Sequence, residues 1–185
     1  MRTILSAQQL AFYKNNGFIE FKIPHEILFS EKRDQWREDE NLFRFIKNKL
    51  GKPALELSHQ KQIRFGVTFW VTVENKPDKG CSIQELISIQ DIEIACVLSP
   101  NPIIPEKRSP LGILPIPQEP QNALFFNPKF ILDWPNAHGN LFFVLFASNS
   151  SVYIENKKAP DTNYLKKLGC FFGDSLTNET HPLIF

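Results

Sequence analysis

The first residues of the chain carry the signature of a short helix. Ser6 is followed three residues later by Gln9, which is the spacing of a capping box, where each side chain bonds to the backbone N–H of the other residue. Gly17 stands where many helices end in a left-handed residue. The pattern therefore predicts a helix over residues 7–16.

Runs of β-branched and aromatic residues predict strands along much of the remaining chain. Residues 63–73 read IRFGVTFWVTV and residues 141–147 read LFFVLFA, compositions that are typical of central strands. Residues 83–89 fit either a helical turn or a strand. Shorter runs predict further strands at residues 18–23, 92–98, 123–126 and 152–155. About six strands with irregular connections indicate a barrel or a jelly roll, a mainly β fold with flanking helices.

A densely charged segment leads into a second helical pattern. Eight of the ten residues from 31 to 40 are charged, with both signs mixed. Four apolar residues recur at the spacing of one helix face, namely Trp36, Phe43, Ile46 and Leu50. The tripeptide Gly51-Lys52-Pro53 ends this predicted helix. We interpret the charged run as a solvated helix face, with a partner-binding surface as the alternative.

Two features mark the second half of the chain. Residues 100–120 contain seven prolines and are predicted to be mostly irregular. A loop of this length is uncommon unless it covers something, so it is either a lid over a pocket or a plain connection between two sheets. A closing helix is predicted over residues 161–168, with Asp161 or Thr162 as its N-cap and Gly169 after its end.

The composition favours one β-rich domain. The chain has 185 residues, of which 42% are hydrophobic and 22% charged, which excludes a disordered or collagen-like protein. Seventeen Phe and 14 Pro favour aromatic-rich strands joined by turns. The formal charge of +1 gives no general attraction to nucleic acid or to anionic lipid. We expect a single domain over residues 1–185, with N-terminal helices, about residues 7–50, packed outside the sheets.

The cysteines and the apolar runs favour a cytoplasmic protein. Cys81, Cys96 and Cys170 are odd in number, widely spaced and without a CxxC pair, so we expect buried structural thiols. The first residues lack the apolar core of a signal peptide, and the longest apolar run, residues 141–147, is too short to cross a bilayer. We therefore expect a soluble cytoplasmic protein without a membrane partner.

The chain lacks the sequence motifs of several enzyme classes. The eight glycines form neither the dinucleotide-binding GxGxxG pattern nor a phosphate-binding P-loop. No GxSxG nucleophile elbow and no HExxH zinc motif is present. The histidines are scattered, which favours structural roles over a ligand cluster: His25, His59, His138 and His181.

Three segments resemble the phytanoyl-CoA dioxygenase family. The opening SAQQLAFYKNNGFIEF is similar to that family's first helix, which ends at Gly and leads into a strand. NALFFNPKFILDWPN is similar to the family's strand and turn around its C-terminal metal histidine, and LKKLGCFFGDSLTNETHPLIF resembles a tail of bacterial members. The resemblance implies a double-stranded β-helix, a cupin-like jelly roll that holds Fe(II) and 2-oxoglutarate in active members.

The chain departs from that family at each position that would hold a cofactor. Active members bind iron through a His-x-Asp/Glu pair and a distant His, but no histidine here has an acidic residue two positions later. Asp133 falls at or beside the position of the distant histidine, and His138 lies five residues beyond it. The family also holds 2-oxoglutarate with a basic residue shortly after that histidine. No arginine follows Arg108, and the first lysines after His138 are Lys157 and Lys158.

Three functional hypotheses follow, of which we favour the first. The first is a degenerate oxygenase-like protein, without dioxygenase activity or a cofactor, that binds a small molecule or a protein. The second is a metal-dependent oxygenase with relocated ligands, His59, Asp133 and His138, and only this case would require Fe(II) and 2-oxoglutarate. The structural alternative is that Asp133 caps a turn and His138 is solvated. The third is a regulator in which divalent cations alter binding to DNA or to a partner. The DNA version would use a basic patch, for which solvated surface is the alternative interpretation: Lys47, Lys49, Lys52, Lys61 and Arg64.

Overall fold

Strands and short helices alternate along the chain. The computed structural model describes residues 4–24, 32–72, 74–99, 114, 117, 119, 121–134, 140–159 and 161–184. The strands are β1 (Phe18–Lys22), β2 (Ile63–Val71), β3 (Cys81–Ser82), β4 (Ile92–Leu98), β5 (Asn122–Phe126), β6 (Ile131–Leu132) and β7 (Leu141–Ser148). The helices are α1 (Ala7–Asn16), η1 (Gln35–Arg37), α2 (Glu40–Phe45), η2 (Ile46–Leu50), α3 (Gly51–Ser58), η3 (Ile83–Leu86) and α4 (Thr162–Lys167).

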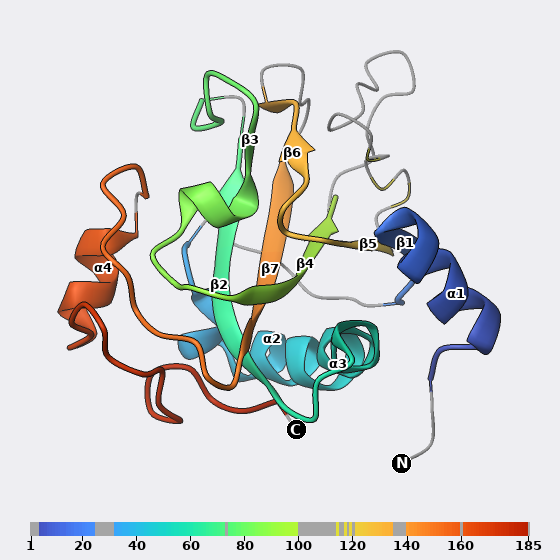
Figure 1. Ribbon diagram of the computed structural model, residues 1–185, viewed down its shortest axis with the longest axis horizontal. Helices are drawn as coiled ribbons and strands as arrows, with labels where there is room; N and C mark the ends of the chain where they lie inside the picture. The colour runs from blue at the N-terminus through green and yellow to red at the C-terminus, as the bar shows by residue number, and fades with distance from the viewer. Residues whose placement is uncertain are drawn as a thin grey trace.

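The strands form two antiparallel sheets. A five-stranded sheet has the order β1-β5-β4-β7-β2, and β3 pairs with β6 in a two-stranded sheet (Figure 1). Within the larger sheet, Phe143 of β7 lies between Val97 of β4 and Phe69 of β2. The predicted fold class is confirmed: the chain is a mainly β jelly roll with a few flanking helices.

The position of β7 explains its continuous apolar sequence. β7 lies between β4 and β2, and neighbouring side chains of a strand point to opposite faces of the sheet. Phe143 and Leu145 are buried on the face toward the two-stranded sheet, whereas Phe142 and Val144 are buried on the face toward the helices. Because both faces are covered, every position requires an apolar residue and no alternation remains visible.

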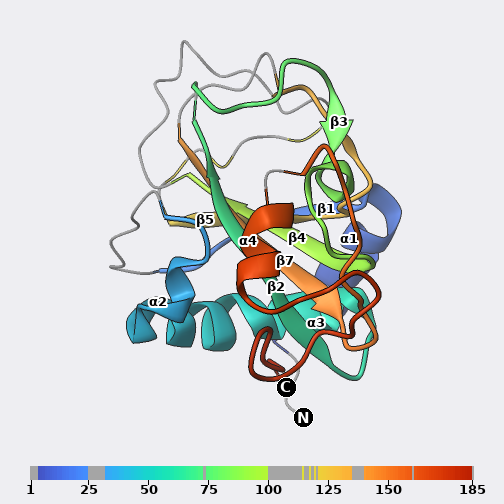
Figure 2. The same ribbon diagram turned by 90° about the vertical axis from the view of Figure 1, so that its left-hand side faces the viewer.

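Different structures cover the two faces of the five-stranded sheet. α2, η2 and α3 lie across one face (Figure 2). Leu42, Ile46 and Leu50 from these helices form one buried cluster with Phe125 and Phe146 from the sheet. The opposite face packs against β3, η3, β6 and the chain that follows β7. The jelly-roll interior is therefore the space between the five-stranded sheet and the two-stranded sheet.

The predicted first helix is confirmed together with both of its caps. Ser6 Oγ accepts a hydrogen bond from Gln9 N at 3.2 Å, and Gln9 Oε1 accepts one from Ser6 N at 2.8 Å. Gly17 ends α1 with φ +74°, and its N–H bonds to Tyr13 O. A side chain at Gly17 would also meet the ring of Phe130, so glycine is required for two reasons.

The prediction that Gly51-Lys52-Pro53 ends the second helix is wrong. The helix continues as α3 up to Ser58. A wider π turn, η2, precedes it, in which the N–H of Gly51 bonds to Ile46 O. Pro53 then lies in the first turn of α3, where a residue without an N–H is tolerated. A Cβ at Gly51 would clash with Ile184, so this glycine allows the C-terminal segment to approach rather than stopping the helix.

The C-terminal segment covers the outer edge of β2. Phe65 N donates to Pro182 O at 3.0 Å, and Ile184 N donates to Ile63 O at 2.9 Å. These bonds satisfy backbone groups that an edge strand would otherwise leave open. β2 also contains an irregular register at Gly66, whose missing side chain lets the backbone approach Leu145 O.

Other predictions have mixed outcomes. The predicted strand over residues 152–155 is wrong, because Val152 and Tyr153 form only isolated bridges, to Ser175 and Ile89. For residues 83–89, the helical turn was one of two predicted alternatives. The structure has this turn as η3, which covers the first part of the segment. β3 and β6 were not predicted, since two residues carry no detectable periodicity. The closing helix is confirmed as α4.

Part of the sequence prediction falls outside the described residues. Most of the proline-rich stretch 100–120 lies there, so neither a lid nor a plain connection is tested, and so does Val73 at the end of the predicted central strand. None of the helices in the described part of the chain is long and apolar enough to cross a membrane.

Candidate functional site

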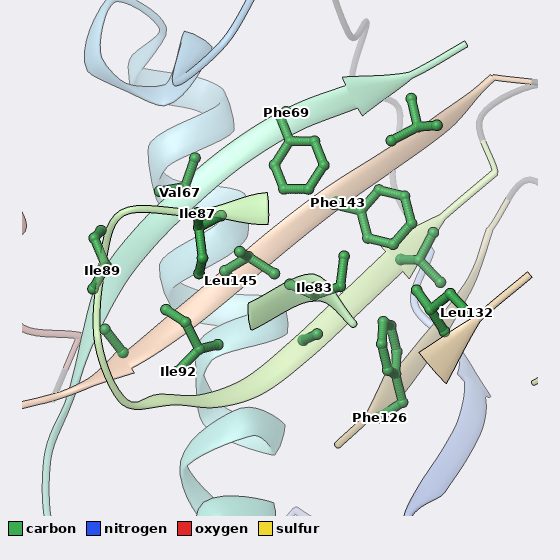
Figure 3. Packing of buried hydrophobic residues seen from close by; sticks show 14 of the residues in the cluster. Val67, Phe69, Ile83, Ile87, Ile89, Ile92, Phe126, Leu132, Phe143 and Leu145 are labelled. Carbon is green, nitrogen blue, oxygen red and sulfur yellow. The ribbon is translucent and has the colours of Figure 1, made fainter. Parts of the chain in front are cut away.

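Apolar side chains fill the space between the two sheets (Figure 3). Phe69 of β2 stacks on Phe143 of β7, with ring centroids 5.2 Å apart, and Phe126 of β5 meets Phe143 edge-on at 6.4 Å. Ile83 and Leu132 close this layer from the side of the smaller sheet. Charged groups are costly in such surroundings unless they are paired.

An indole ring occupies the end of this interior beside β6. Trp134 is fully buried, its ring lies 5.5 Å from that of Phe143, and its Nε1 donates to Cys81 O at 2.9 Å. Trp134 directly follows Asp133, the position at which the resemblance places the distant metal histidine.

The structure does not bring the predicted metal ligands His59 and Asp133 together. His59 is exposed and ends α3 in a left-handed conformation with φ +55°, whereas Asp133 follows β6. α3 and β6 lie at opposite ends of the five-stranded sheet (Figure 1, Figure 2). His138 lies outside the described residues, so its role as a ligand stays a prediction.

The remaining donor atoms do not form an alternative iron site. Across residues 4–24, 32–72 and the other described stretches, no group of three His, Cys, Asp or Glu side chains is placed to hold a metal ion. Cys81, Cys96 and Cys170 are buried free thiols, as predicted. Burial raises the pKa of each of them, most strongly for Cys96, so the thiolate form that binds metals is disfavoured.

A cavity of about 470 Å³ lies at the far end of β2, at the border of the packed interior. Its lining comes from the last residues of β2, from η3, from the turn before α4 and from the segment before η1. These residues include Arg33, Phe69, Trp70, Val71, Leu86 and Lys158. The cavity therefore combines aromatic and aliphatic walls with two cationic side chains.

Arg33 is fixed at the cavity by a buried ion pair. Its Nη2 lies 2.9 Å from Oδ2 of Asp161, which is fully buried, and its guanidinium lies 5.4 Å from the ring centroid of Phe69. Ser88 N also donates to Asp161 Oδ2, at 3.3 Å. Asp161 does occupy the N-cap position of α4, but its side chain makes no capping bond. The prediction that Asp161 caps this helix is therefore wrong for its side chain, which pairs with Arg33 instead.

A second buried ion pair adjoins the first. Arg37 Nε lies 3.5 Å from Oδ2 of Asp34, while Asp34 Oδ1 accepts from Thr68 N at 2.7 Å and from Trp36 Nε1 at 3.3 Å. Burial raises the pKa of Asp34, and Arg37, the Thr68 bond and Arg33 counteract this rise. The segment before η1 is thus attached to β2 through one carboxylate.

These pairs correct the interpretation of the charged run over residues 31–40. Lys32 and Glu38 are exposed, at 68% and 71% of their side-chain surface, as a solvated face requires. Arg33 and Arg37 are only 22% and 17% exposed, and Asp34 is buried. The run therefore contains both solvated positions and positions that are largely covered by the rest of the protein. No local pattern separates the two kinds of position, because the partner of Arg33 lies far along the chain.

His181 is a buried histidine close to the same cluster. Its two ring nitrogens have no hydrogen-bond partner within the described chain. Burial, together with the positive charges of Arg37 and Arg64, lowers the pKa of His181 from 6.5 to about 3. Arg64 Nη1 donates to His181 O at 3.0 Å and to Asn178 Oδ1 at 2.8 Å. Arg64, expected in a basic patch, thus anchors the C-terminal segment.

Comparisons with known proteins support the fold. The chain matches no protein-family model and no curated protein. It is similar in structure to SnoK, a non-heme alpha ketoglutarate dependent carbocyclase from nogalamycin biosynthesis, with a TM-score of 0.65, 11% identity and coverage of 98% of this chain and 97% of that chain. The epimerase SnoN from the same biosynthesis gives 0.64 and 12%, with 96% and 98% covered. CT296 from Chlamydia trachomatis gives 0.50 and 17%, with 80% and 98% covered. The chain thus has the jelly-roll fold of non-heme alpha-ketoglutarate-dependent enzymes.

Proposed function

We propose that this protein is a degenerate member of the phytanoyl-CoA dioxygenase family that keeps the jelly roll, has lost the iron and 2-oxoglutarate chemistry, and binds a small molecule. The observation that carries the proposal is the apolar packing of the interior, closed by the buried Trp134. An active site for iron and a dicarboxylate needs polar ligands in that space, because unpaired charges in an apolar interior are strongly destabilising. No cofactor is therefore assigned.

The cavity beside β2 supports the binding role. Its volume of about 470 Å³ falls within the range of small-molecule sites, which are mostly apolar and carry a few well-placed polar groups. A protein partner would need a larger continuous surface than this cavity provides. Function can change in this way while the fold persists, since function depends on sites and not on architecture. The free thiols agree with a reducing compartment, and we place the protein in the cytoplasm.

The test is a turnover assay. The purified protein is incubated with Fe(II), ascorbate and 2-oxoglutarate across a panel of carboxylic and acyl-thioester substrates, and succinate is measured. We expect succinate at the level of the protein-free blank. Succinate above the blank that disappears in His59→Ala or His138→Ala would contradict the proposal and support an oxygenase with relocated ligands.

Calorimetry with Fe(II), Mn(II) and Zn(II) tests the metal separately. We expect no difference between the wild type and the variants Asp133→Ala and His138→Ala. Metal binding that both variants abolish, without any succinate formation, would contradict the absence of a cofactor and support a cation-responsive regulator.

A further inference from the structure

We propose that the cavity at the end of β2 binds a small organic monoanion, a carboxylate with an apolar or aromatic body. This inference rests on the proposed binding function and names its ligand class. Among the described residues that line the cavity, Arg33 and Lys158 are charged and none is acidic. Phe69, Trp70 and Leu86 form apolar walls. A ligand that matches both kinds of surface carries one anionic group on an apolar body.

The charges of the cavity favour a single negative charge on the ligand. Arg33 is already balanced by Asp161, at 2.9 Å. Lys158 is exposed, and its Nζ forms no ion pair with any other described residue. The nearby Glu85 is engaged by Ser82, whose N and Oγ lie 3.0 Å and 3.2 Å from Glu85 Oε1. The two cations of the cavity and the two nearby carboxylates, Asp161 and Glu85, balance in charge, so no excess positive charge is present for a second carboxylate. This balance favours a monoanion over a dicarboxylate.

Arg33 is held in position before any ligand arrives. Its guanidinium lies over the ring of Phe69, and Asp161 fixes its Nη2 end. A guanidinium has five N–H donors, so one ion pair does not exhaust its capacity to bind a second carboxylate. Because the side chain is already ordered, ligand binding does not have to pay the conformational entropy of fixing it.

The apolar walls are rigid as well. The ring of Phe69 is stacked on Phe143 at 5.2 Å, and the ring of Trp70 lies 5.3 Å from that of Phe142. Asn75 holds the loop after β2, since its Oδ1 accepts from Thr72 N at 2.8 Å and its Nδ2 donates to Trp70 O at 3.2 Å. Rigid aromatic walls favour flat or bulky apolar ligands over short polar ones.

The experiment compares matched acids and amides by calorimetry and by ligand-detected NMR. The probes are naphthoate and its neutral amide naphthamide, benzoate and benzamide, and 2-oxoglutarate. We expect naphthoate to bind about tenfold more tightly than naphthamide. A hydrogen bond to a charged group is stronger than one to a neutral group, and the difference corresponds to about a tenfold change in affinity. We also expect naphthoate to bind more tightly than benzoate and than 2-oxoglutarate.

Two neighbouring lysines provide the matched variants. Lys157 and Lys158 are both exposed, but only Lys158 is among the described lining residues. Lys158→Gln should lower naphthoate affinity about fivefold to tenfold and reduce its preference over naphthamide, while Lys157→Gln keeps wild-type affinity. Neither exposed substitution should affect folding.

Several results would overturn the proposal. Equal affinity for naphthoate and naphthamide would exclude an anion site, and equal losses in the two lysine variants would exclude this cavity. Preferential binding of 2-oxoglutarate, or no binding of any probe, would exclude the ligand class. None of these results involves succinate, so a failure here is distinguishable from a failure of the proposed function.

Discussion

The jelly-roll interior and the edge of β2 differ in almost every physical property. The interior holds packed aromatic and aliphatic side chains around Phe143, closed by Trp134. The edge of β2 gathers two buried ion pairs, Arg33 with Asp161 and Arg37 with Asp34, beside a cavity. The chain thus concentrates its polar side chains at the border of the roll and not in its interior.

The two regions are stabilised in different ways. Close packing of apolar side chains makes the interior a continuous hydrophobic core. The buried ion pairs cannot be explained in the same way, because removing two charges from water costs about as much free energy as their attraction returns. Their role is to fix the segment before η1 and the start of α4 relative to β2.

The largest effect is expected from emptying the interior. Trp134→Ala should lower the free energy of unfolding by about 4 kcal/mol, since it removes a fully buried indole and its bond to Cys81 O. Urea unfolding followed by circular dichroism measures the change. Phe171→Ala is the control, because Phe171 is 69% exposed and should contribute almost nothing. Similar losses in both variants would show that the interior is not packed as described.

The next effect is expected at the edge of β2. Asp161→Ala should lower the free energy of unfolding by about 3 kcal/mol, because the half-buried Arg33 loses its fully buried counter-charge. Glu38→Ala, which breaks the exposed pair with Lys32, should cost less than about 1 kcal/mol. The measurement is urea unfolding of both variants at one salt concentration. A loss at Glu38 as large as that at Asp161 would contradict the division of the charged run into buried and solvated positions.

The pH dependence of stability tests the surroundings of His181. The unfolded chain protonates this histidine near pH 6.5, whereas the folded pKa is about 3, so between these values the unfolded state binds more protons. Stability therefore falls as pH falls, by about 2 kcal/mol between pH 6.5 and pH 5. Arg37 and Arg64 face the ring and act in the same direction.

His181→Asn should remove this part of the pH dependence, even if it lowers stability at every pH. His59→Gln changes an exposed histidine and serves as the control. Urea unfolding at several pH values gives the slopes. Parallel slopes for the wild type and His181→Asn would show that His181 is accessible to protons in the folded state.

The smallest effect compares adjacent residues of β2. Val67 is buried on the interior face, whereas Thr68 is buried beside Asp34, and its Oγ1 has no hydrogen-bond partner in the described part of the protein. Thr68→Val should leave stability unchanged or raise it by up to about 1 kcal/mol, because a buried unsatisfied hydroxyl is removed. Val67→Thr should lower stability by about 1 kcal/mol, since it buries such a hydroxyl. Both variants are measured by urea unfolding. A loss of stability in Thr68→Val together with a gain in Val67→Thr would contradict the assignment of these residues to the two faces of β2.

Local signals allowed several elements to be predicted correctly. The bounds of α1 follow from Ser6, Gln9 and Gly17, because capping bonds join residues only a few positions apart. The strands β2, β4, β5 and β7 follow from β-branched and aromatic runs that no helix face would require. The missing His-x-acid pair is likewise visible in the sequence alone.

Long-range contacts decided what the sequence could not. Gly51 and Pro53 read as a helix end, yet the helix continues because Ile184 packs against Gly51 and a π turn precedes Pro53. Arg33 looks like any other residue of a solvated charged run, and it becomes a half-buried wall of a cavity only because Asp161 lies next to it at the start of α4. Capping and strand composition depend on residues that are close together in the chain, so they can be predicted from the sequence. Burial, desolvation and ion pairing depend on which distant segments meet, which is settled only when the sheet has formed.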